Sequence, residues 1–192
     1  MKSVDIFLAL VALPGRVRNR LFNLVFSKLR GVEVRIVWSD VKIIGASRME
    51  FGNRFFAGRG LWLEAVEERS RLVIGNNVNV SDWVHIGALD RVQIGDGCLL
   101  GSKVIITDHS HGMVDDIAAS MPPVRPDARP LRSKGPVVLQ SNVWLGDAVA
   151  VLSGVTIGSG AIIGANSVVT HDIPSNTVWA GVPAIQIWPK FP

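Results

Sequence analysis

A strict six-residue period constrains the fold of this chain more than any other feature. From residue 137 to residue 169, every sixth position holds a bulky aliphatic side chain, and the position two residues before it is small or β-branched. The bulky positions are Leu139, Leu145, Val151, Ile157, Ile163 and Val169, and the smaller positions are Val137, Val143, Val149, Val155, Ala161 and Ser167. An α-helix would scatter these positions around its whole surface, so the period excludes a helix.

The same period occurs earlier in the chain, where it slips by two residues near Leu89 and Asp90 and then resumes. The bulky positions of this earlier part are Ile74, Val80, Ile86, Ile94, Leu100 and Ile106. If each hexad is one short strand followed by a corner, three hexads make one triangular coil with the bulky side chains inside. Stacked coils then form a solenoid with a continuous aliphatic core. The predicted fold is all-β: a parallel β-helix with a short N-terminal helix and a long protruding loop.

The predicted organisation is an N-terminal helical segment over residues 1–35, followed by one β-helix domain over residues 36–188. The chain has 192 residues, of which 48% are apolar, and this length and composition suit one domain. The apolar run from Ile6 to Leu13 is too short to span a bilayer. The segment from Arg16 to Arg30 places apolar residues at helical spacing among basic ones, which is typical of an amphipathic helix. This helix either caps the core or rests on a membrane surface.

Charge and cysteine content narrow the class of partner. Lys and Arg exceed Asp and Glu by 20 to 16 without any dense basic run, so no nucleic-acid partner is predicted. The single cysteine, Cys98, excludes an internal disulfide framework and a cysteine-rich zinc site, which fits a reducing compartment. We therefore expect a cytoplasmic protein that could reach the inner face of the membrane through its N-terminal segment.

Three motifs together resemble the hexapeptide-repeat acyltransferases. They are the hexads, the run NVWLGDAVAVLSGVTIGSGAIIGANSVVTHDIP from Asn142 to Pro174, and the closing AGVPA from Ala180 to Ala184. Within that superfamily the chain is similar to the maltose and galactoside O-acetyltransferase-like group, and most of all to the O-acetyltransferases of lipopolysaccharide and capsule biosynthesis. The resemblance covers roughly residues 40–188.

The resemblance implies a left-handed β-helix and a homotrimer whose active sites lie between neighbouring subunits. It also implies acetyl-CoA as co-substrate, and transfer of its acetyl group to a sugar hydroxyl of a surface polysaccharide or of its lipid-linked precursor. A histidine of such an enzyme would activate the acceptor hydroxyl as a general base.

The segment over residues 108–136 is predicted to be the protruding loop, because the hexads are lost there and five prolines occur in it. Loops of this length are usually functional. The loop opens with the sequence TDHSHG, which contains His109 and His111. If the hexad register continued, Ser110 and Gly112 would take inward positions, and His111 would face outward as a base able to accept a proton near neutral pH. We therefore place the general base at His111, with His109 as second choice.

By resemblance, Trp144 would face outward beside the pantetheine arm of CoA or the acceptor, although it could equally pack under the loop or at the trimer contact. The resemblance also implies that several small residues and one basic residue of this chain contact CoA. They are Gly146, Ala165, Ser167, Thr170 and Lys190. Lys190 is the only basic residue after AGVPA, so charge for the CoA phosphates could come from the loop instead. The candidates there are Arg125, Arg129, Arg132 and Lys134.

The sequence leaves three alternatives open. A γ-carbonic anhydrase-like enzyme would bind zinc through three histidines. The chain has enough histidines for such a site in His85, His109 and His111, but it lacks the His-x4-His spacing of that family. No metal site is therefore predicted. Transfer to an amino group of an amino sugar is a closer rival. A non-catalytic β-helix scaffold is the third. His85 and His171 are expected to be exposed surface residues.

Overall fold

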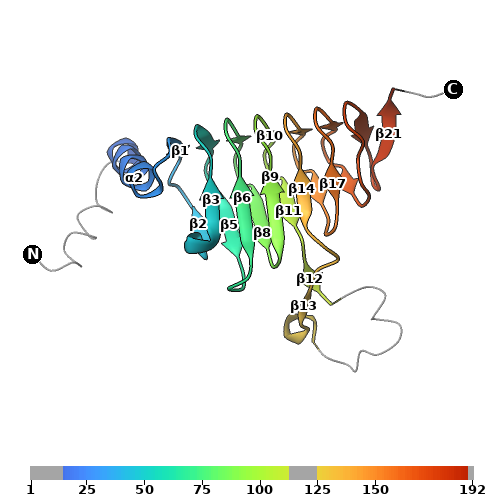
Figure 1. Cartoon of the computed structure of the whole chain (residues 1–192), viewed down its shortest axis with the longest axis horizontal. Coiled ribbons are helices and arrows are strands. Elements are labelled where there is room, and N and C mark those ends of the chain that lie inside the picture. Colours follow the sequence, from blue (N-terminus) through green and yellow to red (C-terminus); the bar gives the residue numbers. More distant parts are fainter. Residues whose placement is uncertain (1–14, 113–124, 190–192) are drawn as a thin grey trace, which may run out of the picture.

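A computed structural model describes residues 15–112 and 125–189. The chain forms a parallel β-solenoid of about seven triangular coils with one helix at its N-terminal end (Figure 1). This arrangement confirms the predicted all-β class, the parallel β-helix, the N-terminal helix and the protruding loop. The apolar run from Ile6 to Leu13 lies outside the described residues, and so does Lys190.

The three walls of the triangle are three sheets. Sheet A contains β1 (Val34–Ile36), β4 (Phe55–Ala57), β7 (Asn79–Val80), β10 (Leu99–Leu100), β15 (Trp144–Leu145), β18 (Ile162–Ile163), β20 (Val178–Ala180) and β21 (Ile185–Trp188). Sheet B contains β2 (Lys42–Ile44), β5 (Trp62–Ala65), β8 (His85–Ala88), β11 (Ile105–Thr107), β16 (Ala150–Val151) and β19 (Val168–Val169). Sheet C contains β3 (Met49–Phe51), β6 (Arg71–Ile74), β9 (Arg91–Ile94), β14 (Val137–Leu139) and β17 (Thr156–Ile157).

The core is the column that the hexads predict. Every bulky hexad position from Ile74 to Val169 is at most 2% exposed, and the smaller positions two residues earlier are at most 1% exposed. Successive coils pair in parallel, so that Leu100 lies between Val80 and Leu145 in sheet A. Backbone hydrogen bonds link the coils, for example from Leu99 N to the carbonyl oxygen of Val143 at 2.9 Å. Equivalent side chains therefore stack directly on one another inside the solenoid.

Tight corners join the walls. Asn77 and Asn142 sit at such corners with φ values of 56° and 61°, in the left-handed region that asparagine tolerates better than most residues. The corner that follows sheet B varies in length from coil to coil. In the first coil it holds a short 3-10 helix, η1 (Ala46–Arg48), and in the third it takes up the two-residue slip at Leu89 and Asp90.

The helix α2 (Gly15–Arg30) closes the N-terminal end of the solenoid. Phe22 and Phe26 pack edge-on against Trp38, with ring centroids 5.7 Å and 5.6 Å apart. The Asn23 amide bonds both backbone groups of Ile36, accepting from its N–H at 2.8 Å and donating to its carbonyl at 3.0 Å. The side chain of Asn23 thus occupies hydrogen-bonding groups that a further strand beside β1 would use. Strand β1 spans the boundary predicted at residues 35 and 36.

The solvent-exposed part of α2 carries apolar side chains among basic ones. Val17, Leu24, Val25 and Leu29 are 50%, 67%, 47% and 79% exposed. None of the helices within the described ranges has the length and apolarity needed to cross a bilayer.

The protruding loop leaves the solenoid at the corner between β11 and β14 as an antiparallel pair (Figure 1). Strand β12 (Ser110–His111) pairs with β13 (Leu131–Arg132), and a short 3-10 helix, η2 (Pro126–Ala128), precedes β13. The inward position expected for Ser110 is wrong: Ser110 is exposed, because pairing with β13 turns this segment out of the coil. The residue that enters the interior after Ile106 is Asp108, which is fully buried.

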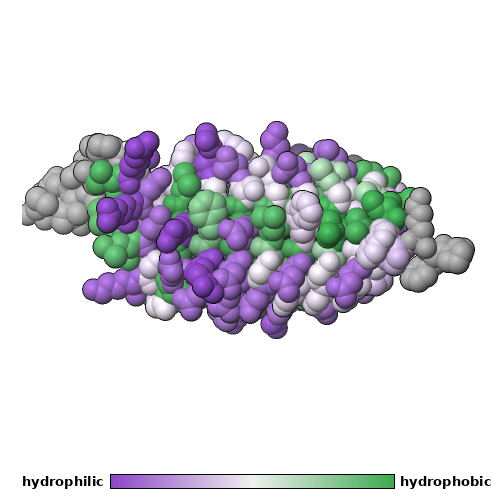
Figure 2. Space-filling model, turned by 90° about the horizontal axis from the view of Figure 1, so that it is seen from above, coloured by the Kyte–Doolittle hydropathy of each residue, from purple (hydrophilic) through white to green (hydrophobic). Residues whose placement is uncertain are grey.

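The outer walls carry an apolar stripe. On sheet A, Leu99, Trp144 and Ile162 are neighbours in register, and Leu99 and Trp144 are about half exposed. Figure 2 shows apolar surface running along the solenoid between polar residues on the side seen from above. Trp144 therefore faces outward, as expected.

Replacing Leu100 by alanine is expected to lower the free energy of unfolding by about 2–5 kcal/mol, because the truncation leaves a cavity in a fully buried position. Its neighbour on β10, Leu99, is partly exposed and provides the matched control, with an expected loss below about 1 kcal/mol for Leu99→Ala. Urea unfolding followed by circular dichroism measures both values. Equal losses would contradict the assignment of inward and outward positions on β10.

Candidate active site

A pocket of about 470 Å³ lies at the root of the protruding loop. Its floor is the outer side of sheet B and the corner after it, and its rim comes from the loop strands β12 and β13. It is lined by Thr107, His109, Ser110, Arg132, Lys134, Leu152, Ser153, Thr170 and His171. The pocket thus gathers one of the two candidate bases and two of the loop's basic side chains.

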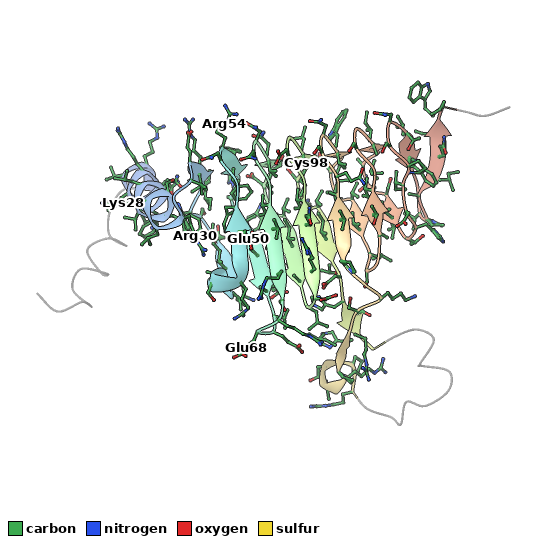
Figure 3. All side chains as sticks on the ribbon, viewed as in Figure 1. Lys28, Arg30, Glu50, Arg54, Glu68 and Cys98 are labelled. Atoms are coloured by element: carbon green, nitrogen blue, oxygen red, sulfur yellow. The ribbon has the colours of Figure 1, made fainter. Side chains whose placement is uncertain are left out.

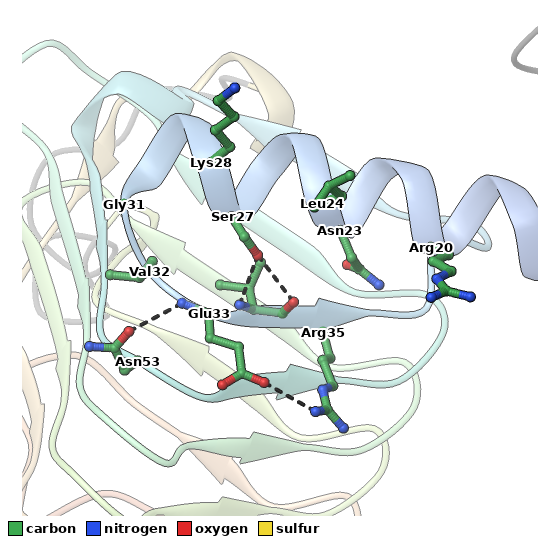
Figure 4. Close-up of a pocket in the computed structure, with 11 residues that line it drawn as sticks. Arg20, Asn23, Leu24, Ser27, Lys28, Gly31, Val32, Glu33, Arg35 and Asn53 are labelled. Atoms are coloured by element: carbon green, nitrogen blue, oxygen red, sulfur yellow. Dashed lines mark hydrogen bonds and ion pairs between the residues drawn. The ribbon is translucent and has the colours of Figure 1, made fainter.

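A larger groove of about 860 Å³ lies at the N-terminal end, between α2 and the first coil (Figure 4). Residues from α2, including Asn23, Leu24 and Lys28, form one side of it, and Glu33 and Arg35 contribute to the other. Glu33 and Arg35 form an ion pair at 3.1 Å. No histidine lines this groove, so acid-base chemistry near neutral pH points to the smaller pocket.

Asp108 is the centre of the hydrogen-bond network beside the pocket. One carboxylate oxygen accepts from Leu89 N at 2.7 Å, and the other accepts from Asp90 N at 2.8 Å and Arg91 N at 2.7 Å. The first oxygen also meets His109 Nδ1 at 3.0 Å. The backbone N–H groups come from the corner where the hexad register slips by two residues. The extra residues of the third coil therefore build the cradle for a carboxylate of the fourth.

These contacts keep Asp108 ionised. Burial alone would raise the pKa of Asp108, but the hydrogen bonds from His109 and from the three backbone N–H groups outweigh burial and hold that pKa below its usual value. A buried carboxylate with this many donors is a fixed negative charge, and it stabilises a positive charge on the imidazole next to it.

His109 is oriented by Asp108. Its side chain is 11% exposed, and Nδ1 points at the Asp108 carboxylate. Because an ionised carboxylate can only accept hydrogen bonds, Nδ1 carries the proton and Nε2 of the neutral ring holds a lone pair. His109 thus has the tautomer that a general base of this kind needs.

Ser153 fastens both ends of the loop to the coil that follows. Its hydroxyl donates to the carbonyl of Asp108 at 2.6 Å and accepts from Lys134 N at 2.7 Å. The start and the end of the loop therefore meet at one side chain, and this contact fixes His109 relative to Lys134.

His111 lies elsewhere on the loop. It is exposed on β12, paired with Leu131 of β13, and does not line the pocket. The structure thus gives His109, the second choice from the sequence, both a partner carboxylate and a place in the pocket. The division of roles between the two histidines remains a prediction to be tested by mutation.

The remaining residues predicted to contact CoA divide into two groups. Thr170 lines the pocket and its hydroxyl meets His171 Nδ1 at 2.7 Å. Trp144, Gly146 and Ala165 lie on or next to sheet A, away from the pocket lining. Ser167 is fully buried and donates to the carbonyl of Gly164 at 2.6 Å. Among the members of this set that the structure describes, only Thr170 lines the pocket with His109.

Asp108 and Glu64, which lie in this region, were not among the residues predicted from the sequence. Asp108 was not singled out, although its position directly before His109 is the signal that could have found it. His85, expected on the exposed surface, is instead half-buried against Glu64, with His85 Nε2 at 2.9 Å from Glu64 Oε1. Glu64 itself carries no sequence motif. His171 is exposed, as expected.

A zinc site of the γ-carbonic anhydrase type would need three converging ligands. Within residues 15–112 and 125–189, no three His, Cys, Asp or Glu side chains lie close enough together to hold a metal ion. His85, His109 and His111 accordingly do not converge in the single chain.

Comparison with known proteins gives matches over most of the chain. Residues 136–171 match the family described as bacterial transferase hexapeptide (six repeats), and residues 91–111 match the hexapeptide repeat of succinyl-transferase. The chain is 43% identical over 169 residues to WbbJ of Escherichia coli (strain K12), which is provisionally named a lipopolysaccharide biosynthesis O-acetyl transferase. That alignment covers 88% of this chain and 83% of WbbJ.

The solved structures that are similar to this chain include two acyltransferases bound to coenzyme A. A galactoside acetyltransferase in complex with coenzyme A matches with a TM-score of 0.50 and 28% identity, over 77% of this chain and 57% of that chain. A variant of AntD, an N-acyltransferase from Bacillus cereus in complex with dTDP-4-amino-4,6-dideoxyglucose and coenzyme A, matches with a TM-score of 0.62 and 18% identity, over 84% and 86% of the two chains. The likeness to AntD concerns the fold alone.

Asp108→Asn is expected to remove part of the pH dependence of stability. The folded protein holds the pKa of Asp108 below its value in an unfolded chain, which is about 3.9. The carboxylate therefore stabilises the fold above that value, and the stabilisation is lost as the pH falls through the folded-state pKa. At neutral pH the substitution should cost about 1–3 kcal/mol, because the backbone donors lose a charged acceptor.

Unfolding free energies measured between about pH 7 and about pH 3 should show this cost shrinking as the pH falls. Asp127→Asn is the control, since the Asp127 side chain is 72% exposed in the loop. A cost that stayed constant across this pH range would be evidence against an ionised Asp108.

Proposed function

The chain belongs to the hexapeptide-repeat acyltransferases, and we propose that it transfers acetyl from acetyl-CoA to a sugar hydroxyl of a surface polysaccharide or its precursor. The observation that carries this proposal is the buried Asp108–His109 pair beside a pocket with Arg132 and Lys134. The name of WbbJ supports O-acetyl transfer, and the CoA bound to the similar galactoside acetyltransferase supports the donor.

His109 is the general base of this reaction. Its Nε2 takes the proton of the acceptor hydroxyl as the hydroxyl oxygen attacks the carbonyl carbon of the acetyl group. The bond between that carbon and sulfur then breaks, and the imidazolium gives its proton to the CoA sulfur, so that His109 returns to its starting state. Asp108 keeps the proton on Nδ1 throughout and stabilises the transient imidazolium.

The basic side of the pocket suits the donor. Arg132 and Lys134 line it, and their positive charge would attract the phosphates of CoA. Both belong to the loop residues that the sequence analysis put forward for this role. Thr170 is the residue of the predicted CoA channel that accompanies them.

We also propose that the protein works as a homotrimer with its active sites between subunits. The apolar stripe of Leu99, Trp144 and Ile162 on sheet A, in which Leu99 and Trp144 are about half exposed, is the kind of surface that subunit contacts bury. In such a trimer sheet A of one subunit would approach the pocket of its neighbour. This arrangement would give Trp144 the role predicted for it beside CoA or the acceptor.

His109→Ala is expected to lower kcat by about 100-fold or more, the range for losing a general base. His111→Ala is the matched control, and kcat should stay within about threefold of wild type, because that substitution removes no group from the pocket. The assay follows CoA release from acetyl-CoA with p-nitrophenyl glycosides as acceptors. A larger loss in His111→Ala would restore the order of preference derived from the sequence.

Calorimetric titration of the same proteins with CoA, together with their metal content, separates the alternatives. Saturable CoA binding in wild type and in His109→Ala is the expected result. Protein that binds no CoA would favour a scaffold, or a γ-carbonic anhydrase-like enzyme if it held zinc stoichiometrically. Faster acetylation of amino sugars than of their hydroxyl counterparts would favour N-acetyl transfer.

We further propose that α2 rests on an anionic membrane at the cytoplasmic face, where a lipid-linked acceptor would be presented. Its outward apolar residues form the kind of face that enters a lipid interface. Every charged residue of α2 is basic: Arg16, Arg18, Arg20, Lys28 and Arg30. Arg30 bonds backbone carbonyls of the first coil, whereas Lys28 points away from the strands in Figure 4. Basic residues at the rim of an apolar face complement anionic headgroups.

Leu24→Asp combined with Leu29→Asp is expected to weaken binding to vesicles of phosphatidylglycerol and phosphatidylcholine at least about tenfold, since each buried Leu contributes about 1.5–3 kcal/mol. Ile185→Asp, at the other end of the solenoid and 63% exposed, should leave binding unchanged. Co-sedimentation measures all three proteins. Unaltered binding by the double variant would mean that α2 is not the contact.

A further inference from the structure

A row of interlocked side chains crosses three coils on the outer side of sheet B. Lys42, Trp62 and His85 occupy equivalent positions on β2, β5 and β8. Lys42 Nζ lies 3.9 Å from the centre of the Trp62 ring, and the His85 ring stacks on Trp62 with centroids 4.0 Å apart and planes 15° from parallel. These contacts give the row a defined geometry on an otherwise open wall.

This row fixes the carboxylate of Glu64. One oxygen accepts a hydrogen bond from Trp62 Nε1 at 3.1 Å, and the other lies 2.9 Å from His85 Nε2. The Glu64 side chain is 16% exposed. Among the residues that the structure describes, His85 is the only ion-pair partner of Glu64. A positioned carboxylate without a Lys or Arg partner in this part of the chain retains capacity to accept hydrogen bonds from a ligand.

Glu64 and His109 both border the open space beside Gly87. A Cβ added at Gly87 would lie 3.2 Å from Glu64 Oε1 and 3.2 Å from His109 Cε1, so the carboxylate and the imidazole border the same point. Gly87 is not among the residues with positive φ, so its backbone conformation does not require glycine. The missing side chain instead leaves open the space that these two polar groups border.

We propose that Glu64 is an acceptor-binding residue, which accepts a hydrogen bond from a sugar hydroxyl beside the one that reacts at His109. A carboxylate only accepts hydrogen bonds, so it selects a ligand that offers donors, and neighbouring hydroxyls are what a sugar ring offers. This inference rests on the proposed function and names the acceptor side of its site.

The charges around His109 support this orientation. Arg132 and Lys134 lie in the pocket with Leu152 and Thr170, which follow β16 and β19 on the C-terminal side of β11. Glu64 belongs to β5, on the N-terminal side of β11. A negative group would repel the CoA phosphates and the basic groups would attract them. The donor therefore lies toward the later coils and the acceptor toward the earlier ones, the end that carries α2.

Glu64→Gln tests this assignment, because it keeps the side chain's shape and removes its charge. The expected result is a rise of about tenfold or more in KM for the p-nitrophenyl glycoside, the scale of a lost hydrogen bond to a charged group. KM for acetyl-CoA and the pH profile of kcat should stay unchanged, since His109 and Asp108 are intact. Glu50→Gln is the matched control, as Glu50 is exposed on β3 in sheet C (Figure 3).

Gly87→Ala provides a second variant, which keeps the carboxylates of both Glu64 and Asp108 but changes the space beside Glu64. Its added methyl group would push Glu64 and His109 apart, so the acceptor KM should rise in this variant too. An unchanged acceptor KM in both variants, or an equal rise in KM for acetyl-CoA, would overturn the inference. Wild-type protein that binds CoA and acetylates none of the glycosides would overturn the proposed function itself, and the inference with it.

Discussion

The stacking of inward aliphatic side chains, in register from coil to coil, is the constraint on which the rest of the structure depends. Parallel pairing places each strand directly above its equivalent, as Leu145 lies above Leu100, so an extra residue inside a strand would turn a core position outward. Extra residues are therefore accommodated at corners. The corner after sheet B accommodates them in the third coil at Leu89 and Asp90 and in the fourth as the protruding loop. The candidate active site lies at that corner.

The interruption of the repeat is therefore part of the site. The two residues that break the register expose backbone N–H groups to Asp108, and Asp108 in turn fixes the ring of His109. A regular hexad at Leu89 would have paired those groups with the neighbouring coil. The Asp108–His109 pair thus depends on the two extra residues at the corner of the third coil. The position of His109 is therefore set by backbone geometry as well as by its side-chain contacts.

The six-residue period predicted the solenoid, its core and the outward position of Trp144, because a period determines which side chains share an interior. It could not predict which residues of different coils meet on the outer walls. His85 and Glu64 are 21 residues apart, and their contact depends on corner lengths that vary between coils. The place of Ser110 was predicted wrongly for a related reason. It is set by pairing with Arg132 across the loop, a long-range contact that a local pattern does not encode.

The two ends of the solenoid determine whether other chains can add on to it. A stack of parallel strands leaves an unpaired edge at each end, and such edges invite other chains to add on and grow into fibres. At one end Asn23 occupies the backbone groups of Ile36. At the other, β21 turns back antiparallel on β20 and lies between Pro183 and Pro189, residues without an N–H to offer a new strand. Both ends of sheet A are thereby protected against the addition of a further strand.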